Sequence, residues 1–155
     1  MKRALLAVAA VAAMAASLPA AAQFQKPEDA IKYRQGAFNI MASHFGRLGA
    51  MAQGRAPYDA KAAAEHMAII NVVHKLPMAA FPAGSDKGHP NRAKSSIWSD
   101  AAGFKAAGDK LVAEMAKLDT AVKAGNADAL KAAFGPVGAT CKGCHDNYRN
   151  DAYAQ

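Results

Sequence analysis

The sequence predicts an all-α protein built from four amphipathic helices. Alanine is abundant, runs of β-branched residues are scarce, and no segment alternates apolar and polar residues for long. These features argue against strands. In four stretches, apolar residues instead recur at steps of three and four, which is the spacing of one face of a helix.

The first predicted helix begins near Pro27 and ends within 49–54. Proline is favourable in a first turn, and Glu28 and Asp29 complement the positive end of the helix. Arg34 lies on the apolar face, where its head could reach solvent at the end of the bundle or bind a buried anion. The rest of that face consists of Ile31, Phe38, Met41, Phe45 and Leu48.

The second predicted helix starts around Asp59, an acceptable N-cap, and runs towards Pro77. His66 and His74 could be considered as iron ligands, but neither lies in a supporting motif, and a histidine on a helix is more often structural or exposed. The predicted inner face consists of Ala63, Met67, Ile70, Val73 and His74.

A long polar loop is predicted over 81–96, because it contains several prolines and glycines, and His89 is expected to be solvated there. The third helix then starts near Ser99 or Asp100 and ends near Gly125. Trp98, just before this helix, is interpreted as a packing residue. The apolar face of the third helix consists of Phe104, Leu111, Met115, Leu118 and Val122.

The fourth predicted helix begins after Asn126 and continues into a cysteine motif. Pro136 lies inside its pattern and should kink or divide it, because proline removes one backbone hydrogen bond and crowds a carbonyl. The tail after Asn150 is expected to be frayed.

The pentapeptide 141–145 reads C-x-x-C-H, which is the attachment signature of a c-type haem. On a helix, Cys141, Cys144 and His145 share one face, so two thiols can bond the haem vinyl groups while the imidazole reaches the iron. A redox dithiol would need a βαβ context, and a zinc site would need two more ligands. A disulfide would close only a small ring. Haem attachment is therefore the favoured interpretation.

Residues 1–22 have the pattern of a secretory signal peptide. Lys2 and Arg3 precede an Ala-rich apolar segment, and small residues up to Ala22 form a cleavage site. A retained membrane anchor is disfavoured because the apolar segment is short for a span. Cleavage leaves 23–155, a single domain of 133 residues, and export to a bacterial periplasm agrees with haem attachment outside the cytoplasm.

The net charge is modest and gives no support for nucleic-acid binding. Loss of Lys2 and Arg3 takes the formal charge from +7 to +5, and charges of both signs are scattered. No basic run is interleaved with aromatic residues. The charge is more relevant to solubility and to steering towards an acidic redox partner.

These features together resemble the cytochrome c-prime family: four amphipathic helices, a leader, and C-x-x-C-H on the last helix. The resemblance covers essentially the whole chain after the leader and is strong at 26–35, 41–47, 56–59, 97–101 and 132–149. It implies an antiparallel four-helix bundle with one covalently bound haem c between the helices at one end.

The resemblance also implies roles for individual residues. His145 would be the axial iron ligand and the sole protein ligand, leaving the iron five-coordinate. Arg34 and Gln35 would lie on the propionate side, Phe38 would close the distal side over the iron, and Arg149 would lie beside the proximal histidine. An aromatic residue at 38, Pro136 and a longer loop between the second and third helices depart from the nearest family pattern.

Two functions remain open at this stage. The first is a periplasmic cytochrome that binds nitric oxide or carbon monoxide at a sterically gated iron, with or without single-electron transfer. The alternative is a plain electron carrier that serves periplasmic redox partners. An enzyme is not expected, because no distal acid–base pair is evident. No membrane association is expected after cleavage, and relatives suggest a homodimer formed through the first two helices.

Overall fold

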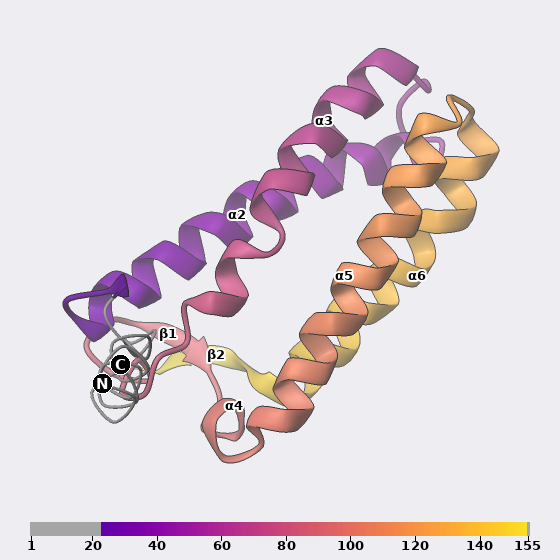
Figure 1. Ribbon diagram of the computed structural model, residues 1–155. Helices are drawn as coiled ribbons and strands as arrows, with labels where there is room; N and C mark the ends of the chain where they lie inside the picture. The colour runs from indigo at the N-terminus through magenta and orange to yellow at the C-terminus, as the bar shows by residue number, and fades with distance from the viewer. Residues whose placement is uncertain (1–22, 155) are drawn as a thin grey trace, which may run out of the picture.

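The computed structural model describes residues 23–154, and the predicted leader and its cleavage site lie outside that range. Four long helices form an antiparallel bundle (Figure 1): α2 (Pro27–Ala52), α3 (Ala60–Val73), α5 (Ala101–Lys123) and α6 (Ala127–Tyr148). Helix α2 packs against α3 and α6, and α5 packs against the same two helices. The predicted fold class is therefore confirmed.

The predicted helix starts agree with the observed caps. Asp59 accepts hydrogen bonds from the backbone N–H groups of Lys61 and Ala62 at the start of α3. Asp100 and Asn126 accept the corresponding bonds at the starts of α5 and α6. Since each side chain satisfies backbone donors that have no partner within the helix, these residues fix where the helices begin.

The polar loop predicted over 81–96 contains one strand, β1 (Asn91–Ala93), and ends at one helical turn, α4 (Ser96–Ser99). A short 3₁₀ helix, η3 (Leu76–Ala79), precedes it after the end of α3. Trp98 donates its indole N–H to the carbonyl oxygens of Phe81 and Pro82, which agrees with a packing role.

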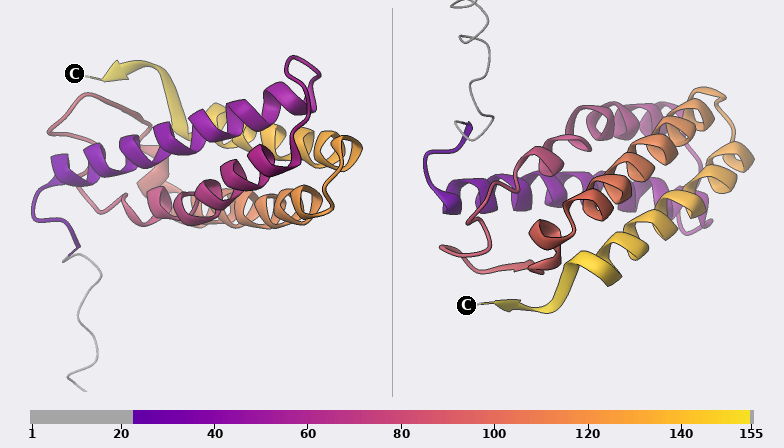
Figure 2. Two further views of the ribbon diagram at one scale, coloured as in Figure 1. Left: turned by 90° about the horizontal axis from the view of Figure 1, so that it is seen from above. Right: turned by 60° about the horizontal axis from the view of Figure 1, so that its bottom comes forward.

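The expectation of a frayed tail was wrong. Residues Arg149–Ala154 form strand β2, which continues from the end of α6 (Figure 2) and pairs antiparallel with β1. The pairing places Ala93 opposite Arg149 and Asn91 opposite Ala154. A tail with no strand-like pattern of its own is thus ordered by a partner strand that is distant in the sequence.

Pro136 does not divide the last helix, because α6 is continuous from Ala127 to Tyr148. The alternative expectation, a kink at Pro136, stays a prediction. The carbonyl of Ala132, which would normally accept the bond that Pro136 cannot donate, belongs to an exposed residue, so water can satisfy it.

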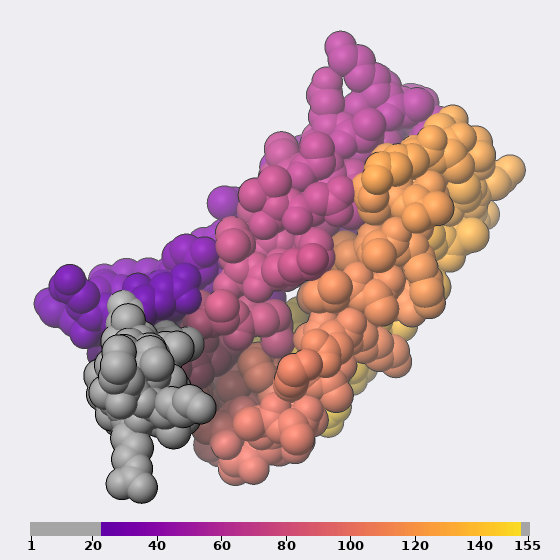
Figure 3. Space-filling view, viewed as in Figure 1, coloured from indigo at the N-terminus to yellow at the C-terminus, as the bar shows by residue number. Residues whose placement is uncertain are grey.

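The bundle core draws apolar side chains from all four helices. Its buried members are Met41, Leu48, Met51, Ala52, Ala63, Met67, Ile70, Val73, Leu111, Met115, Leu118, Val122, Leu130 and Val137. Figure 3 shows α3 and α5 packed side by side on the viewed face, with the surface hollowed below α3. No helix among residues 23–154 is long and apolar enough to cross a membrane.

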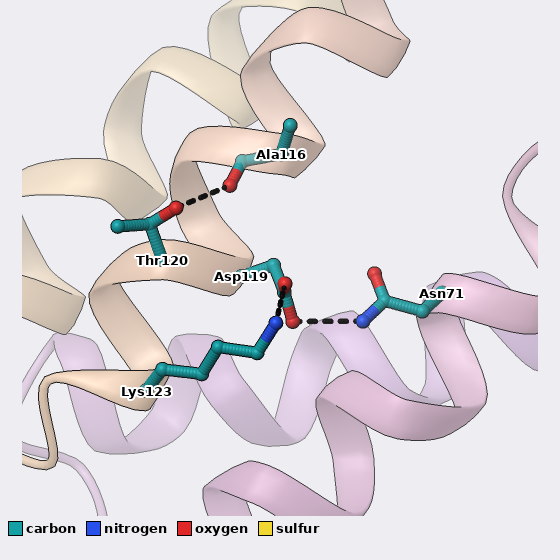
Figure 4. A network of polar contacts seen from close by, with 5 residues as sticks. All are labelled: Asn71, Ala116, Asp119, Thr120 and Lys123. Carbon is teal, nitrogen blue, oxygen red and sulfur yellow. Dashed lines mark hydrogen bonds and ion pairs between the residues drawn. The ribbon is translucent and has the colours of Figure 1, made fainter.

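A network of polar contacts links α3 to α5 outside this core (Figure 4). The side-chain amide of Asn71 donates to Asp119 at 2.8 Å, and Lys123 forms an ion pair with the other oxygen of that carboxylate at 2.6 Å. These contacts hold the pKa of Asp119 below its usual value, chiefly through the hydrogen bond from Lys123.

Close packing of α2 on α6 depends on Gly49. A Cβ atom there would come within 2.5 Å of the ring of Phe134, which stacks on Phe45 with ring centroids 4.3 Å apart. We therefore expect Gly49→Ala to lower the free energy of unfolding by about 1–2 kcal/mol, because overpacking outweighs the gain in helix propensity.

Gly36→Ala is the matched control for this prediction, because Gly36 lies in the same helix and a Cβ there would meet nothing within 4 Å. It should raise the free energy of unfolding by up to about 1 kcal/mol. Urea unfolding of both variants tests the pair, and equal stabilisation by both would contradict the packing argument.

Candidate functional site

Helix α6 presents the three residues of the haem-attachment motif on one side. Cys141 and Cys144 are free thiols, and both are half-buried, as is His145. Burial raises the pKa of both thiols. Burial also lowers the pKa of His145, and the nearby charge of Arg149 adds to this effect. The imidazole is thus held in its neutral form, which is the form that ligates metals.

A cavity of about 1040 Å³ opens beside this motif, between α2, α5, α6 and the segment that contains β1. Every residue that the sequence analysis assigned to the site lines this cavity, although they come from three separate elements. These residues are Arg34, Gln35 and Phe38 of α2, Cys141, Cys144 and His145 of α6, and Arg149 of β2. The volume lies at the upper end of the range for cofactor sites.

Arg34 is buried, with 3 % of its surface exposed, so its head does not reach solvent. Its Nη1 donates to the carbonyl of Ala80 at 2.9 Å and to the hydroxyl of Ser85 at 2.8 Å, and its Nη2 donates to the carbonyl of Ser85 at 2.6 Å. The guanidinium carbon also lies 4.3 Å from the ring centroid of Phe81. Burial lowers its pKa to about 10, and Asp86 opposes this shift, so the cation persists at neutral pH.

Neighbouring residues of α2 complete this wall of the cavity. The Gln35 side chain donates to the carbonyl of Pro90 at 2.9 Å, which adds a second link between α2 and the segment before β1. Phe38 is half-buried and packs against the bundle core. Phe38 thus contributes to the apolar lining of the cavity a benzyl ring that has no atom able to bind a metal.

The end of α6 is held by contacts that the sequence analysis missed. The Tyr148 hydroxyl donates to Asp100 at 2.8 Å, and the Tyr148 ring meets the Phe104 ring edge-on, with centroids 5.3 Å apart. The side chains of Lys94 and Ser96 donate to the carbonyls of Asp146 and Asn147. No local pattern signals these contacts, since all of them join residues about 50 positions apart.

Three of the four histidines outside the motif, His66, His74 and His89, have different surroundings. His89 is half-buried and lines the cavity, so the expectation that it would be solvated was only partly right. His66 and His74 do not line it. His74 is buried, with its Nδ1 2.9 Å from the carbonyl of Ile70.

The sequence matches the family profile described as cytochrome c′ over residues 29–149. The chain belongs to the cytochrome c′ family. It is 58 % identical over 127 residues to cytochrome c′ of Rubrivivax gelatinosus, a match that covers 82 % of this chain and 98 % of the relative. The crystal structure of that protein superposes with a TM-score of 0.80 and covers 83 % of this chain and all of the other.

A second group of relatives comes from Alcaligenes. Cytochrome c′ of Alcaligenes xylosoxydans xylosoxydans is 49 % identical over 127 residues, covering 82 % of this chain and 98 % of the relative. The nitric oxide complex of a point mutant of cytochrome c prime from Alcaligenes xylosoxidans has a TM-score of 0.78 at 47 % identity, covering 83 % of this chain and 99 % of the other.

As a member of the cytochrome c′ family, the protein carries one covalently bound haem c. The described residues fit that group: two free thiols and a neutral imidazole share one side of α6 and face a cavity of suitable volume. Cys141 and Cys144 would form the thioethers, and His145 would supply the axial nitrogen to the iron.

Replacing Arg34 tests its role in holding the cavity wall. Arg34→Met removes three donors from the acceptors of Ala80 and Ser85, and Ser85 is fully buried. We expect the free energy of unfolding to fall by about 2–3 kcal/mol, because buried acceptors are left unpaired. Urea unfolding of the haem-loaded protein measures this loss.

Arg47→Met provides the control, because Arg47 is exposed on the same helix and makes one hydrogen bond to Ser43 at 3.1 Å. Its effect should stay within about 0.5 kcal/mol. Equal losses for the two variants would show that the contacts of Arg34 contribute no special stability.

Proposed function

We propose that this cytochrome holds its iron through His145 as the sole protein ligand and binds nitric oxide or carbon monoxide on the opposite side, against Phe38. The observation that carries the proposal is that α6 and α2 contribute His145 and Phe38 to the same cavity. We assign Phe38 to the position of a sixth ligand, and a phenyl ring cannot coordinate iron.

Three other side chains with sulfur or imidazole groups also line the cavity: Met41, Met115 and His89. Met41 and Met115 belong to the bundle core and expose 8 % and 1 % of their surface. The backbone carbonyl of His89 accepts a hydrogen bond from the Asn91 side chain. We propose that none of these three side chains binds the iron.

When bound, haem c supplies a redox-active iron with one open coordination position. His145 provides one nitrogen, and the helix that carries it is fixed through Tyr148 and Asp100. Phe38 excludes water and bulky ligands from the other side, and it offers no hydrogen-bond donor to a bound gas. Dioxygen, which benefits from such a donor, is therefore disfavoured relative to nitric oxide and carbon monoxide.

Two charged side chains complete the proposed site. The relation i+4 places Arg149 one turn from His145, and its charge contributes to the lowered pKa of that histidine. We assign Arg149 to the proximal side. Arg34 and Gln35 are assigned to the propionate side, which is supported by their position on the cavity wall and by the buried cation of Arg34.

The proposal also covers the location of the protein and its oligomeric state. The leader pattern of residues 1–22 supports export to the periplasm with cleavage after about Ala22. Exposed apolar side chains on α2 and α3, namely Ile40, Ile69 and Val72, support a homodimer formed through these helices. We propose no enzymatic turnover.

Substitution of Phe38 tests the steric gate. Phe38→Ala should raise the association rate of carbon monoxide with the reduced protein by at least about tenfold, because the ligand no longer has to displace the ring. Lys32→Ala, an exposed site on the same helix that does not line the cavity, should leave the rate unchanged. Flash photolysis or stopped-flow mixing gives the rate. Equal rates for Phe38→Ala and the parent protein would show that Phe38 does not hinder ligand binding.

Optical spectra of the reduced parent protein test the coordination itself. They should be high-spin and should change on addition of carbon monoxide, because the open position accepts the gas. A low-spin spectrum that carbon monoxide leaves unaltered would show a second protein ligand opposite His145 and would refute the proposal.

A deletion strain separates gas binding from the alternative, a plain carrier of single electrons between periplasmic partners. If the protein buffers nitric oxide, loss of the gene should slow growth under nitrosative stress, and the gene with Phe38 intact should restore it. A strain that tolerates nitric oxide normally but loses respiratory electron flow would favour the carrier.

A further inference from the structure

Two histidines outside the haem cavity face each other across the α2–α3 contact. The Nδ1 atoms of His44 and His66 lie 3.2 Å apart, and the ring centroids lie 5.2 Å apart with an angle of 65° between the planes. Both rings are half-buried, and neither residue lines the cavity beside the haem motif. Nothing in haem binding requires this pair.

The protonation state of His66 leaves a lone pair available. Burial lowers the pKa of His66, and the neighbouring His44 and Arg47 lower it further. His66 is therefore neutral at neutral pH. A neutral imidazole carries its hydrogen on one ring nitrogen only, so the tautomer with hydrogen on Nε2 leaves Nδ1 free to bind a metal.

We propose that His44 and His66 form a chelating site for a borderline divalent transition cation such as Zn²⁺, with water completing the coordination. Imidazole nitrogens bind Zn²⁺ at about 2.0–2.1 Å, so two of them at a tetrahedral angle lie about 3.3 Å apart. The observed separation of 3.2 Å nearly matches this value. The two helices need not move to bring the ligands together.

The surroundings of the pair permit a cation but add no third protein ligand. Among residues 23–154 there is no group of three or more histidine, cysteine or acidic side chains arranged around one metal position. Glu65 contributes a favourable negative charge next to His66. The Arg47 side chain opposes the cation, although its Nη1 is bonded to the Ser43 hydroxyl at 3.1 Å.

Cation binding at this pair would stabilise the folded protein. His44 and His66 are 22 positions apart and belong to different helices, so the paired arrangement exists only in the folded protein. A ligand that binds the native state and not the unfolded chain raises stability by mass action. Zn²⁺ would thus join α2 to α3 independently of haem.

Zn²⁺ titration of the haem-loaded protein tests the proposal. Calorimetry should show saturable binding at pH 7.5, and Zn²⁺ should raise the melting temperature by about 3 °C or more. His44→Gln and His66→Gln should each weaken binding by at least about tenfold, because a chelate becomes a single ligand. Mg²⁺, which prefers oxygen ligands, should produce neither effect.

His89→Gln is the matched control, because it removes a half-buried histidine that lies outside the pair. It should bind Zn²⁺ as the parent protein does. Far-UV circular dichroism of each variant verifies that the protein has folded. If either variant of the pair fails to fold, diethyl pyrocarbonate labelling of the parent protein replaces it: Zn²⁺ should protect His44 and His66 but not His89.

Three results would each refute the proposed Zn²⁺ site. Absence of Zn²⁺ binding by the parent protein up to millimolar concentrations would refute it, as would unchanged binding by both His44→Gln and His66→Gln. Labelling of His44 and His66 at the same rate with and without Zn²⁺ would refute it as well. Gas binding at the haem would be unaffected in each case, so failure here is distinguishable from failure of the proposed function.

Discussion

The fixed spacing of the haem vinyl groups and iron is the constraint on which this structure depends. Two thiols and an imidazole can match this spacing only if Cys141, Cys144 and His145 share one face of an unbroken helix. The chain secures the final turns of α6 from outside: Lys94 and Ser96 bind carbonyls that have no partner within the helix, and Tyr148 is fastened to Asp100. The β1–β2 pair then continues this anchoring beyond the end of the helix. The segment between α3 and α5 is thus part of the site.

Arg34 plays the corresponding role on the opposite wall. A buried cation is costly unless its donors are used, and here three hydrogen bonds and the face of Phe81 surround it. Because the acceptors belong to residues 80–85, the same contacts that compensate the charge also position the loop against α2. Gln35 repeats the arrangement one residue further on, through the carbonyl of Pro90. The cavity wall is therefore held by bonds to the backbone, independently of any bound group.

Local signals in the sequence were sufficient for the helices, because helical periodicity and capping by Asp59, Asp100 and Asn126 are encoded within a few residues. They were also sufficient for the haem motif, in which three residues carry the chemistry at a fixed spacing. Local signals failed to predict the features that depend on residues far away in the sequence. Strand β2 needs β1, the bond from Tyr148 needs Asp100, and His44 meets His66 only after α2 packs on α3. Division of the helix at Pro136 was wrongly offered for a related reason, because the cost of proline depends on whether the freed carbonyl is exposed, and exposure is a property of the whole bundle.

The cavity lies where the helices of the bundle diverge. Near the loop that joins α2 to α3, Gly49 lets α2 approach α6 closely enough for Phe134 to stack on Phe45. Towards the end that carries β1, β2 and α4, the helices diverge (Figure 1), and the space between α2, α5 and α6 is left to the cavity. A group that binds only the native state adds stability where the side chains leave space.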